Sequence, residues 1–391
     1  MESVARIGLE PRVERAVALP WPLGALLFGS TSIVVGLLWD ISWHMSIGRD
    51  TVWTPAHMAI YLGGVLAGIS GGWLALRTTF AGTAAEQAVA VRFWGFRAPY
   101  GAWVAVWGAL AMLISAPFDD WWHNAYGLDV KIISPPHSVL AAGMIFIQIG
   151  AMLLAASWQN RAPEGRSRTL EIAFLYSAGV ILLMLATLLT EYVFPNRQHG
   201  AAFYKITAAV FPLLLVAVAR ASRLRWAATL TAVFYMSIAL AMVWILPLFP
   251  AQPLLAPINT PIDHMVPALF PMLLIVPALG IDLIFLIVSA REGKRSRWWL
   301  APLLAAAFVA LFFVTQWSFS SFQLSPAARN RVFAGDMQWS YSSTPGPYRH
   351  EFWEVEEDPV TPGKMGTAFL LASGACLAGL GWGSWMARVK R

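Results

Sequence analysis

The chain has 391 residues, of which 58% are hydrophobic and only 12% are charged, and its mean hydropathy is +0.60. A soluble domain carries about 25% charged residues, so the composition excludes an ordinary soluble protein. The net charge of +6 does not indicate nucleic-acid binding, because the basic residues form short clusters between apolar runs. The single cysteine, Cys376, excludes an internal disulfide and a thiolate-rich metal site.

Uninterrupted apolar runs of about 20 residues recur along the chain, enough to cross a hydrocarbon core of about 30 Å as helices. The runs do not alternate in polarity, which argues against the strands of a transmembrane barrel. We therefore predict an all-α, polytopic transmembrane helical bundle of about ten helices. They are expected near residues 21–39, 57–76, 98–118, 137–157, 169–190, 201–219, 226–248, 265–289, 298–317 and 366–386.

The connecting segments alternate in positive charge. One set, together with both ends of the chain, holds 19 of the 27 lysines and arginines, and the other set holds 8. The positive-inside rule assigns the first set to the cytoplasm, with both termini inside, in a multi-pass protein of a bacterial-type inner (plasma) membrane. The N-terminal residues do not resemble a cleavable signal. An odd number of spans, with one apolar run lying in the interface, is the alternative.

All seven histidines fall on the non-cytoplasmic side of this topology, and four of them occur in two matching segments, 39–57 and 118–137. The aligned residues are Asp40 with Asp119, His44 with His123, Gly48 with Gly127, Asp50 with Asp129 and, after one inserted residue, His57 with His137. This correspondence predicts an internal repeat of a helix–loop–helix unit.

The spacing within each unit suits metal binding. Asp40 and His44 are four residues apart and share one face of a helix, while Pro55 predicts a helix start just before His57. A carboxylate with two imidazoles suits copper, zinc or iron and leaves coordination positions open. The candidate metal ligands are Asp40, His44, His57, Asp119, His123 and His137. In the competing interpretation these residues are interfacial anchors and helix caps within a tryptophan belt, but the repetition of the triad favours metal.

At these residues the chain resembles a known family. The segment from Asp40 to His57 is similar to the metal-binding segment of the C subunit of particulate methane and ammonia monooxygenases, including its Arg-Asp-Thr and Thr-Pro-x-His elements. The second cluster of that family has an asparagine where this chain has Asp119, followed by two histidines that match His123 and His137. The resemblance covers roughly residues 20–160 and is most specific in the first segment.

The resemblance implies a copper site in each cluster, with zinc or iron less favoured. It also implies a trimer, companion membrane subunits and a small apolar substrate. The added charge of Asp119 is expected to tighten binding of a divalent cation at the second cluster. The chain has no counterpart of the A or B subunits and no cupredoxin-like region, so catalysis identical to that of those enzymes does not follow.

We divide the chain into a metal-binding region at 1–165, a five-helix region at 166–317, an outer loop or cap at 318–365 and a last helix with a basic tail at 366–391. Residues Glu191, His199, Asp263 and His264 at the outer corners of the second half either echo the metal unit or, as we favour, anchor helices at the interface. Asp282 is expected to pair with a neighbour inside the bundle.

Three functions are compatible with this pattern. The first is a copper-dependent membrane monooxygenase or a subunit of one, with Asp50 or Asp129 supporting the ligands or moving protons. The second is a copper-handling or assembly protein. The third is a structural subunit of a larger complex. A transporter is less favoured, because the first four helices carry few ionisable residues at mid-depth.

Overall fold

The computed structural model describes residues 19–48, 53–127, 134–162, 168–254, 262–288, 298–334 and 358–391. In this part of the chain, nine helices are long and apolar enough to cross a membrane, which confirms the predicted helical bundle and indicates a lipid-bilayer environment. These are α1 (Trp21–Ser46), α2 (Pro55–Phe80), α4 (Tyr100–Tyr126), α5 (Pro135–Arg161), α6 (Arg168–Leu188), α7 (Ala201–Ala221), α8 (Ala227–Ile245, continued by the 3-10 turn η3, Leu246–Leu248), α10 (Leu300–Gln323) and α13 (Pro362–Met386).

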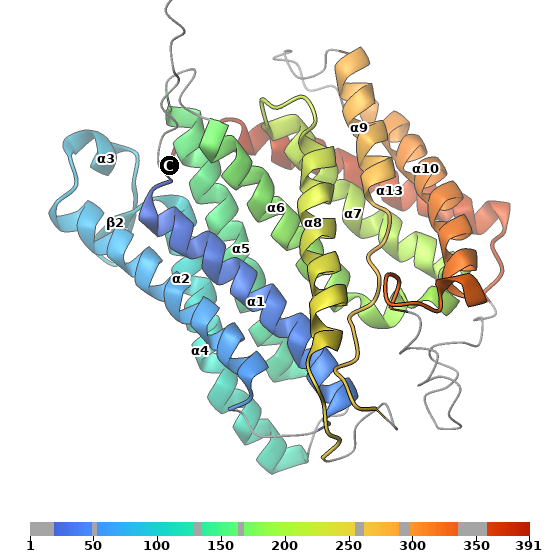
Figure 1. The fold of residues 1–391 in the computed structure, drawn as a ribbon. Helices are drawn as coiled ribbons and strands as arrows, with labels where there is room; N and C mark the ends of the chain where they lie inside the picture. Colours follow the sequence, from blue (N-terminus) through green and yellow to red (C-terminus); the bar gives the residue numbers. More distant parts are fainter. Residues whose placement is uncertain are drawn as a thin grey trace, which may run out of the picture.

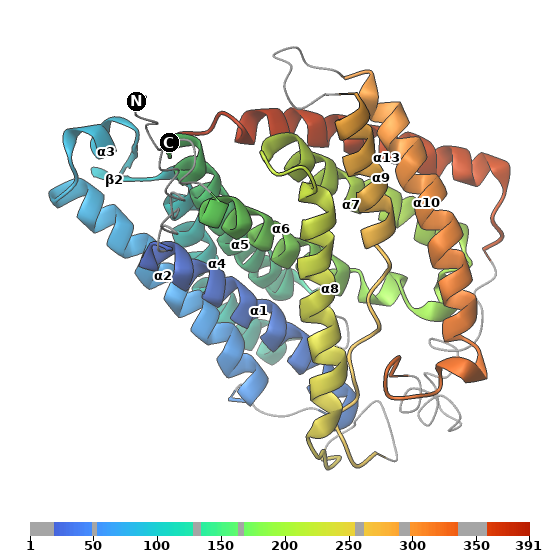
Figure 2. The ribbon, with the colours of Figure 1, turned by 45° about the horizontal axis from the view of Figure 1, so that its top comes forward.

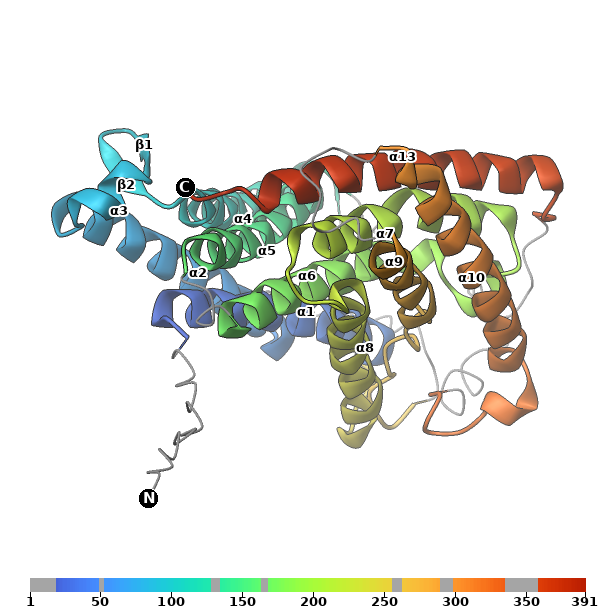
Figure 3. The ribbon, with the colours of Figure 1, turned by 90° about the horizontal axis from the view of Figure 1, so that it is seen from above.

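The helices form one continuous bundle. Figure 1 shows α1, α2, α4 and α5 side by side at one end, with α6, α7 and α8 in the middle. Figure 2 shows α10 and the short helix α9 (Ile275–Ile287) at the opposite end. Seen from above in Figure 3, α13 runs along α7 and closes one side. One end of the bundle holds the predicted ligands. The ends of α1 and α4 and the starts of α2 and α5 lie there (Figure 1).

The predicted helix at 265–289 is wrong in its first half, since residues 265–273 are extended and α9 begins only at Ile275. Pro267 and Pro271 explain the difference, because proline removes a backbone donor and clashes with the preceding turn of a helix. Figure 1 shows this segment between α8 and α10. An extended backbone inside a bilayer must find internal hydrogen-bond partners.

Polar side chains of three helices supply those partners. The N–H of Val266 donates to Ser46 Oγ at 2.7 Å, and Ser42 Oγ donates to the carbonyl of Val266. Deeper in the bundle, the N–H of Met272 donates to the Tyr235 hydroxyl at 3.0 Å, and that of Leu273 donates to Gln316 Oε1 at 2.9 Å. The extended segment is therefore held by α1, α8 and α10.

A small hairpin between α2 and α4 also lies outside the predicted helices. The short helix α3 (Ala84–Ala88) precedes it. The hairpin consists of β1 (Val91–Phe93) and β2 (Phe96–Ala98), with Phe93 paired to Phe96. Its turn residues, Trp94 and Gly95, both have positive φ, which is the backbone that a two-residue hairpin turn requires. The remaining short elements are the 3-10 turns η1 (Thr190–Tyr192), η2 (Pro195–Arg197) and η4 (Pro326–Ala328).

The region at 318–365, which we predicted as an outer loop or cap, begins within a helix. Helix α10 continues to Gln323, six residues beyond its predicted end, and η4 follows it. Residues 335–357, which include the aromatic and acidic part of that region, lie outside the described residues.

Candidate metal centre

The end of α1 carries the first two predicted ligands. Asp40 and His44 lie on its last turns, and His44 Nε2 is 3.7 Å from Asp40 Oδ2. The helix ends shortly after, because Gly48 adopts a φ of +98° and its N–H donates to the carbonyl of Trp43 at 3.1 Å. A glycine in this left-handed conformation is a common helix terminator. The chain can thereby turn back toward α2.

The start of α2 carries the third ligand. Thr54 caps this helix, accepting a hydrogen bond from the His57 N–H at 3.1 Å, and Pro55 occupies the first turn as predicted. This cap fixes the backbone of His57 and directs its ring toward α1. His57 Nε2 lies 3.1 Å from Asp40 Oδ1. The carboxylate of Asp40 therefore contacts imidazoles from two helices.

One ligand atom from each of Asp40, His44 and His57 lies within 4.8 Å of the others. Two ligands that each bind one ion at about 2.0–2.2 Å are themselves roughly 3–4 Å apart, so the triad fits a single metal ion after small side-chain adjustments. The Asp40 side chain is 17% exposed and that of His44 is 46% exposed. The group is thus covered on the bundle side and open at His44, where water or another ligand can approach.

Close contact between α1 and α2 sets the distance across this site. A methyl group placed on Gly29 would lie 2.9 Å from the carbonyl oxygen of Gly63, so only glycine permits the observed approach. This crossing lies about three turns before Asp40 on α1 and about two turns after His57 on α2, and it fixes the two helices as neighbours.

The second predicted cluster is built from α4 and α5 in the same manner. Ser134 caps α5 by accepting a hydrogen bond from the His137 N–H at 3.3 Å, and His137 Nε2 lies 3.6 Å from Asp119 Oδ1. Gly127 ends α4 with a φ of +89°. A methyl group on Gly143 would lie 2.8 Å from the carbonyl oxygen of Gly108.

The third member of the second cluster is not placed. His123 belongs to α4, one turn after Asp119, but its side chain lies outside the described part of the structure. Asp50 and Asp129, the predicted supporting carboxylates, also fall outside the described residues. The structure therefore brings together the three residues of the first cluster and two of the second.

Tyr61 is a site residue that the sequence did not reveal. It lies one turn after His57 on α2, and the two rings are stacked with centroids 6.2 Å apart. Its phenol is close enough to interact electrostatically with both Asp119 and Asp40. The spacing of four residues from His57 was the only indication in the sequence. Tyr61 thus lies within range of both candidate clusters.

The polar residues of the second half behave as structural groups. His199, just before α7, contacts Ser321 Oγ at 2.9 Å, and the His264 ring, in the non-helical segment before α9, contacts Asp263 at 2.9 Å. Burial lowers the pKa of His199, which keeps this imidazole neutral at physiological pH. Asp282 has partners inside the bundle, since it accepts hydrogen bonds from the Thr229 N–H and hydroxyl, both at 2.8 Å.

The fold and this geometry define the protein as a polytopic helical membrane protein with a carboxylate–imidazole triad at one end of its bundle. Comparisons of the chain with protein-family models, curated proteins and solved structures gave no match.

Proposed function

We propose that this chain is a membrane copper protein, similar to the C subunit of copper membrane monooxygenases, in which Asp40, His44 and His57 hold a copper ion. One observation supports the proposal above all others: the Asp40 carboxylate contacts imidazole nitrogens of both His44 and His57, which come from two helices. Buried or half-buried charges in membrane helices are expensive unless they are paired or bind an ion.

The donor set supports copper. Two imidazoles and one carboxylate, without sulfur, are suitable for copper, zinc or iron, and three protein ligands leave positions for exogenous molecules. The preference for copper over zinc or iron rests on the resemblance of residues 40–57 to the monooxygenase segment.

We also infer that the two clusters arose from an internal repeat, and three corresponding structural features, represented by four pairs of residues, support this inference. The two helix ends, the two caps and the two close helix crossings match at separations of 79 or 80 residues. The pairs are Gly48 with Gly127, Thr54 with Ser134, Gly29 with Gly108, and Gly63 with Gly143. On this basis, Asp119, His123 and His137 form a second copper site.

The proposed activity is oxidation of a small apolar substrate by dioxygen at the outer membrane face. Bound copper would supply the redox chemistry. Asp40 would hold the cation by its charge and orient both imidazoles, and the cap at Thr54 would keep His57 in place. An apolar substrate would reach the helices from the bilayer, while the half-exposed His44 would face the aqueous side.

Metal analysis of the purified protein tests the proposal. Copper bound per chain should fall in Asp40→Ala and His57→Ala, whereas the matched variant His199→Gln should bind as much as the wild type, because His199 contacts Ser321 instead. Coupling to imidazole nitrogens in the electron paramagnetic resonance spectrum should weaken in His57→Ala. Unchanged copper content in both cluster variants would disprove the copper site.

Copper handling or assembly is the second candidate, and the exposure of His44 favours it, since an open ligand can pass an ion to a partner. Oxidation assays with short-chain alkanes separate the two functions. Copper-loaded protein that never oxidises a substrate, alone or with companion subunits, would favour handling. A trimeric assembly, as the resemblance implies, is checked by the mass of the protein in detergent or nanodiscs.

A further inference from the structure

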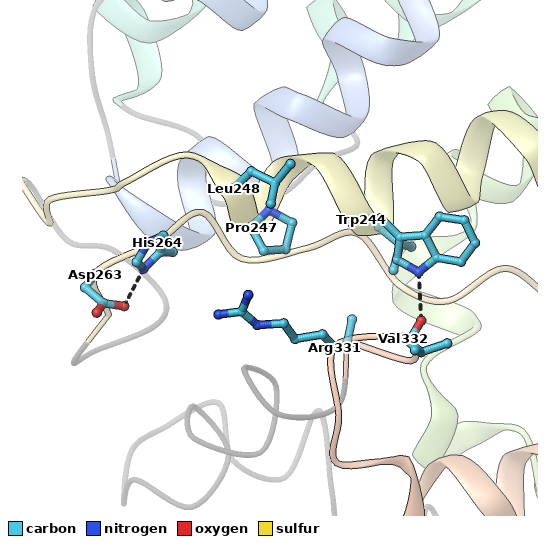
Figure 4. Close-up of a pocket in the computed structure, with 9 residues that line it drawn as sticks. Trp244, Pro247, Leu248, Asp263, His264, Arg331 and Val332 are labelled. Atoms are coloured by element: carbon cyan, nitrogen blue, oxygen red, sulfur yellow. Dashed lines mark hydrogen bonds and ion pairs between the residues drawn. The ribbon is translucent and has the colours of Figure 1, made fainter.

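A cavity separate from the candidate metal centre lies at the end of α8. It has a volume of about 500 Å³ and is formed by the last turn of α8, by η3, by residues 263–264 and by the turn at 331–334. Figure 4 shows the apolar side chains of Pro247 and Leu248 on one wall and the guanidinium group of Arg331 pointing into the space toward His264. The cavity thus combines an apolar wall with charged groups.

The cavity lies at one end of a candidate membrane span, where the border between hydrocarbon and lipid headgroups is expected. The candidate membrane span that begins at Ala227 ends at Leu248, so the cavity lies beside the last turns of that span. Trp244 closes one edge and donates from its indole N–H to the carbonyl oxygen of Val332 at 3.0 Å. Tryptophan is typical of this interfacial depth, where one end of its ring is apolar and the other is hydrated.

The cavity carries both signs of charge. Arg331 has no hydrogen-bond or ion-pair partner among the described residues, so its donors face the cavity or solvent. Opposite it, Asp263 lies 2.9 Å from the ring of His264. The hydrogen bond from His264 lowers the pKa of Asp263, so this carboxylate is ionised at neutral pH. A ligand of matched charge needs one anionic and one cationic group.

We propose that this cavity binds the headgroup of a zwitterionic aminophospholipid such as phosphatidylethanolamine. Arg331 binds the phosphate, whose oxygens accept hydrogen bonds from the planar guanidinium group. Asp263 accepts hydrogen bonds from the ammonium group, and an acyl chain lies against Val243 and Leu248. Phosphatidylglycerol has no cation for Asp263, and phosphatidylcholine has no N–H to donate to it.

The proposal is tested by native mass spectrometry of the full-length protein with equal amounts of phosphatidylethanolamine, phosphatidylglycerol and phosphatidylcholine. The wild type should retain phosphatidylethanolamine in preference to the other two. Arg331→Gln should lower that retention about tenfold, the effect of losing a hydrogen bond to a charged group. Asp263→Asn should remove the preference over phosphatidylglycerol. Its side chain is 88% exposed, so this variant leaves folding intact.

Arg329→Gln is the matched control, since it removes an arginine that lies two residues before Arg331 and does not line the cavity. Its lipid retention should equal that of the wild type. Equal retention of all three lipids by the wild type would overturn the proposal. Two further results would do so as well: an Asp263→Asn variant that keeps the preference, or an Arg329→Gln variant as defective as Arg331→Gln. None of these lipid measurements requires copper, so they test this proposal independently of the proposed function.

Discussion

His57 Nε2 lies 3.1 Å from Asp40 Oδ1, although the two residues belong to different helices and are separated by a turn in the chain. The same carboxylate reaches His44 at 3.7 Å through its other oxygen. Asp40 is therefore the residue that both imidazoles contact. A bound cation would neutralise its negative charge.

Replacing Asp40 by asparagine keeps the shape of the side chain and removes its charge. We expect copper affinity to fall about 10- to 100-fold, because the site loses an anionic ligand that also orients two imidazoles. Competition with a chromophoric copper chelator measures the change. Asp120→Asn is the control, since Asp120 contacts Asn124 and no described histidine. Equal losses in the two variants would show that the effect is not specific to the triad.

His137→Ala should affect only the second cluster. The copper stoichiometry is expected to fall from about two ions to about one per chain, since His137 contacts Asp119 of the second cluster. Metal analysis alongside His57→Ala and the double variant gives the result. Two ions in His137→Ala would show that His137 does not hold the second ion.

Gly63→Leu should separate α1 from α2. Its side chain would collide with the carbonyl oxygen of Gly29 and with Ile33, so we expect a destabilisation of about 1–3 kcal/mol together with weaker copper binding. Gly72→Leu on the same helix is the control, because nothing lies within 4 Å of a Cβ atom placed there. Thermal unfolding in detergent compares them. Equal stability of the two variants would contradict the role given to this crossing.

Asp282→Ala should destabilise the second half of the bundle. Asp282 on α9 accepts hydrogen bonds at the start of α8, from the Ala228 N–H at 3.3 Å and from both the N–H and hydroxyl of Thr229. These donors would lose a charged partner, which costs about 1–3 kcal/mol or more. Thr229→Ala removes only one of the bonds and should cost less. The order of the two melting temperatures tests this assignment.

Asp358 should make stability depend on pH in the acid range. The hydrogen bond from Lys364 and then that from the Ala202 N–H hold its pKa below the ordinary value of 3.8. A folded-state pKa below the unfolded one contributes stability above pH 3.8, and this contribution is lost as the pH falls through the folded pKa. Wild type should therefore melt above Asp358→Asn at pH 7, and the difference should shrink as the pH falls below 3.8. A constant difference would contradict this role.

Hydropathy was sufficient to locate nine of the ten predicted spans, because long helices in a bilayer need continuous apolar runs. It failed at 265–274 because an apolar extended segment has the same hydropathy as an apolar helix. Pro267 and Pro271 were the indication in the sequence that this segment is not helical. Tyr235 and Gln316, which accept hydrogen bonds from its backbone, lie far away in the chain.

The first triad was predictable because its geometry is local. Four-residue spacing places Asp40 beside His44, and Pro55 indicates the helix start that positions His57. The glycine crossings and Tyr61 were not predictable, since they depend on which helices become neighbours and at what angle. Position along the chain does not determine these contacts.

The two serines near the end of α1 give the extended segment a mechanical connection to the triad. Ser42 and Ser46 form hydrogen bonds with the backbone of Val266 from one face of the helix. Asp40 and His44 project from the opposite face. A rotation of this helix end cannot displace the ligands without also pulling on the backbone at Val266. The extended segment around Val266 thus restrains the last turns of α1, on the side of the helix opposite the ligands.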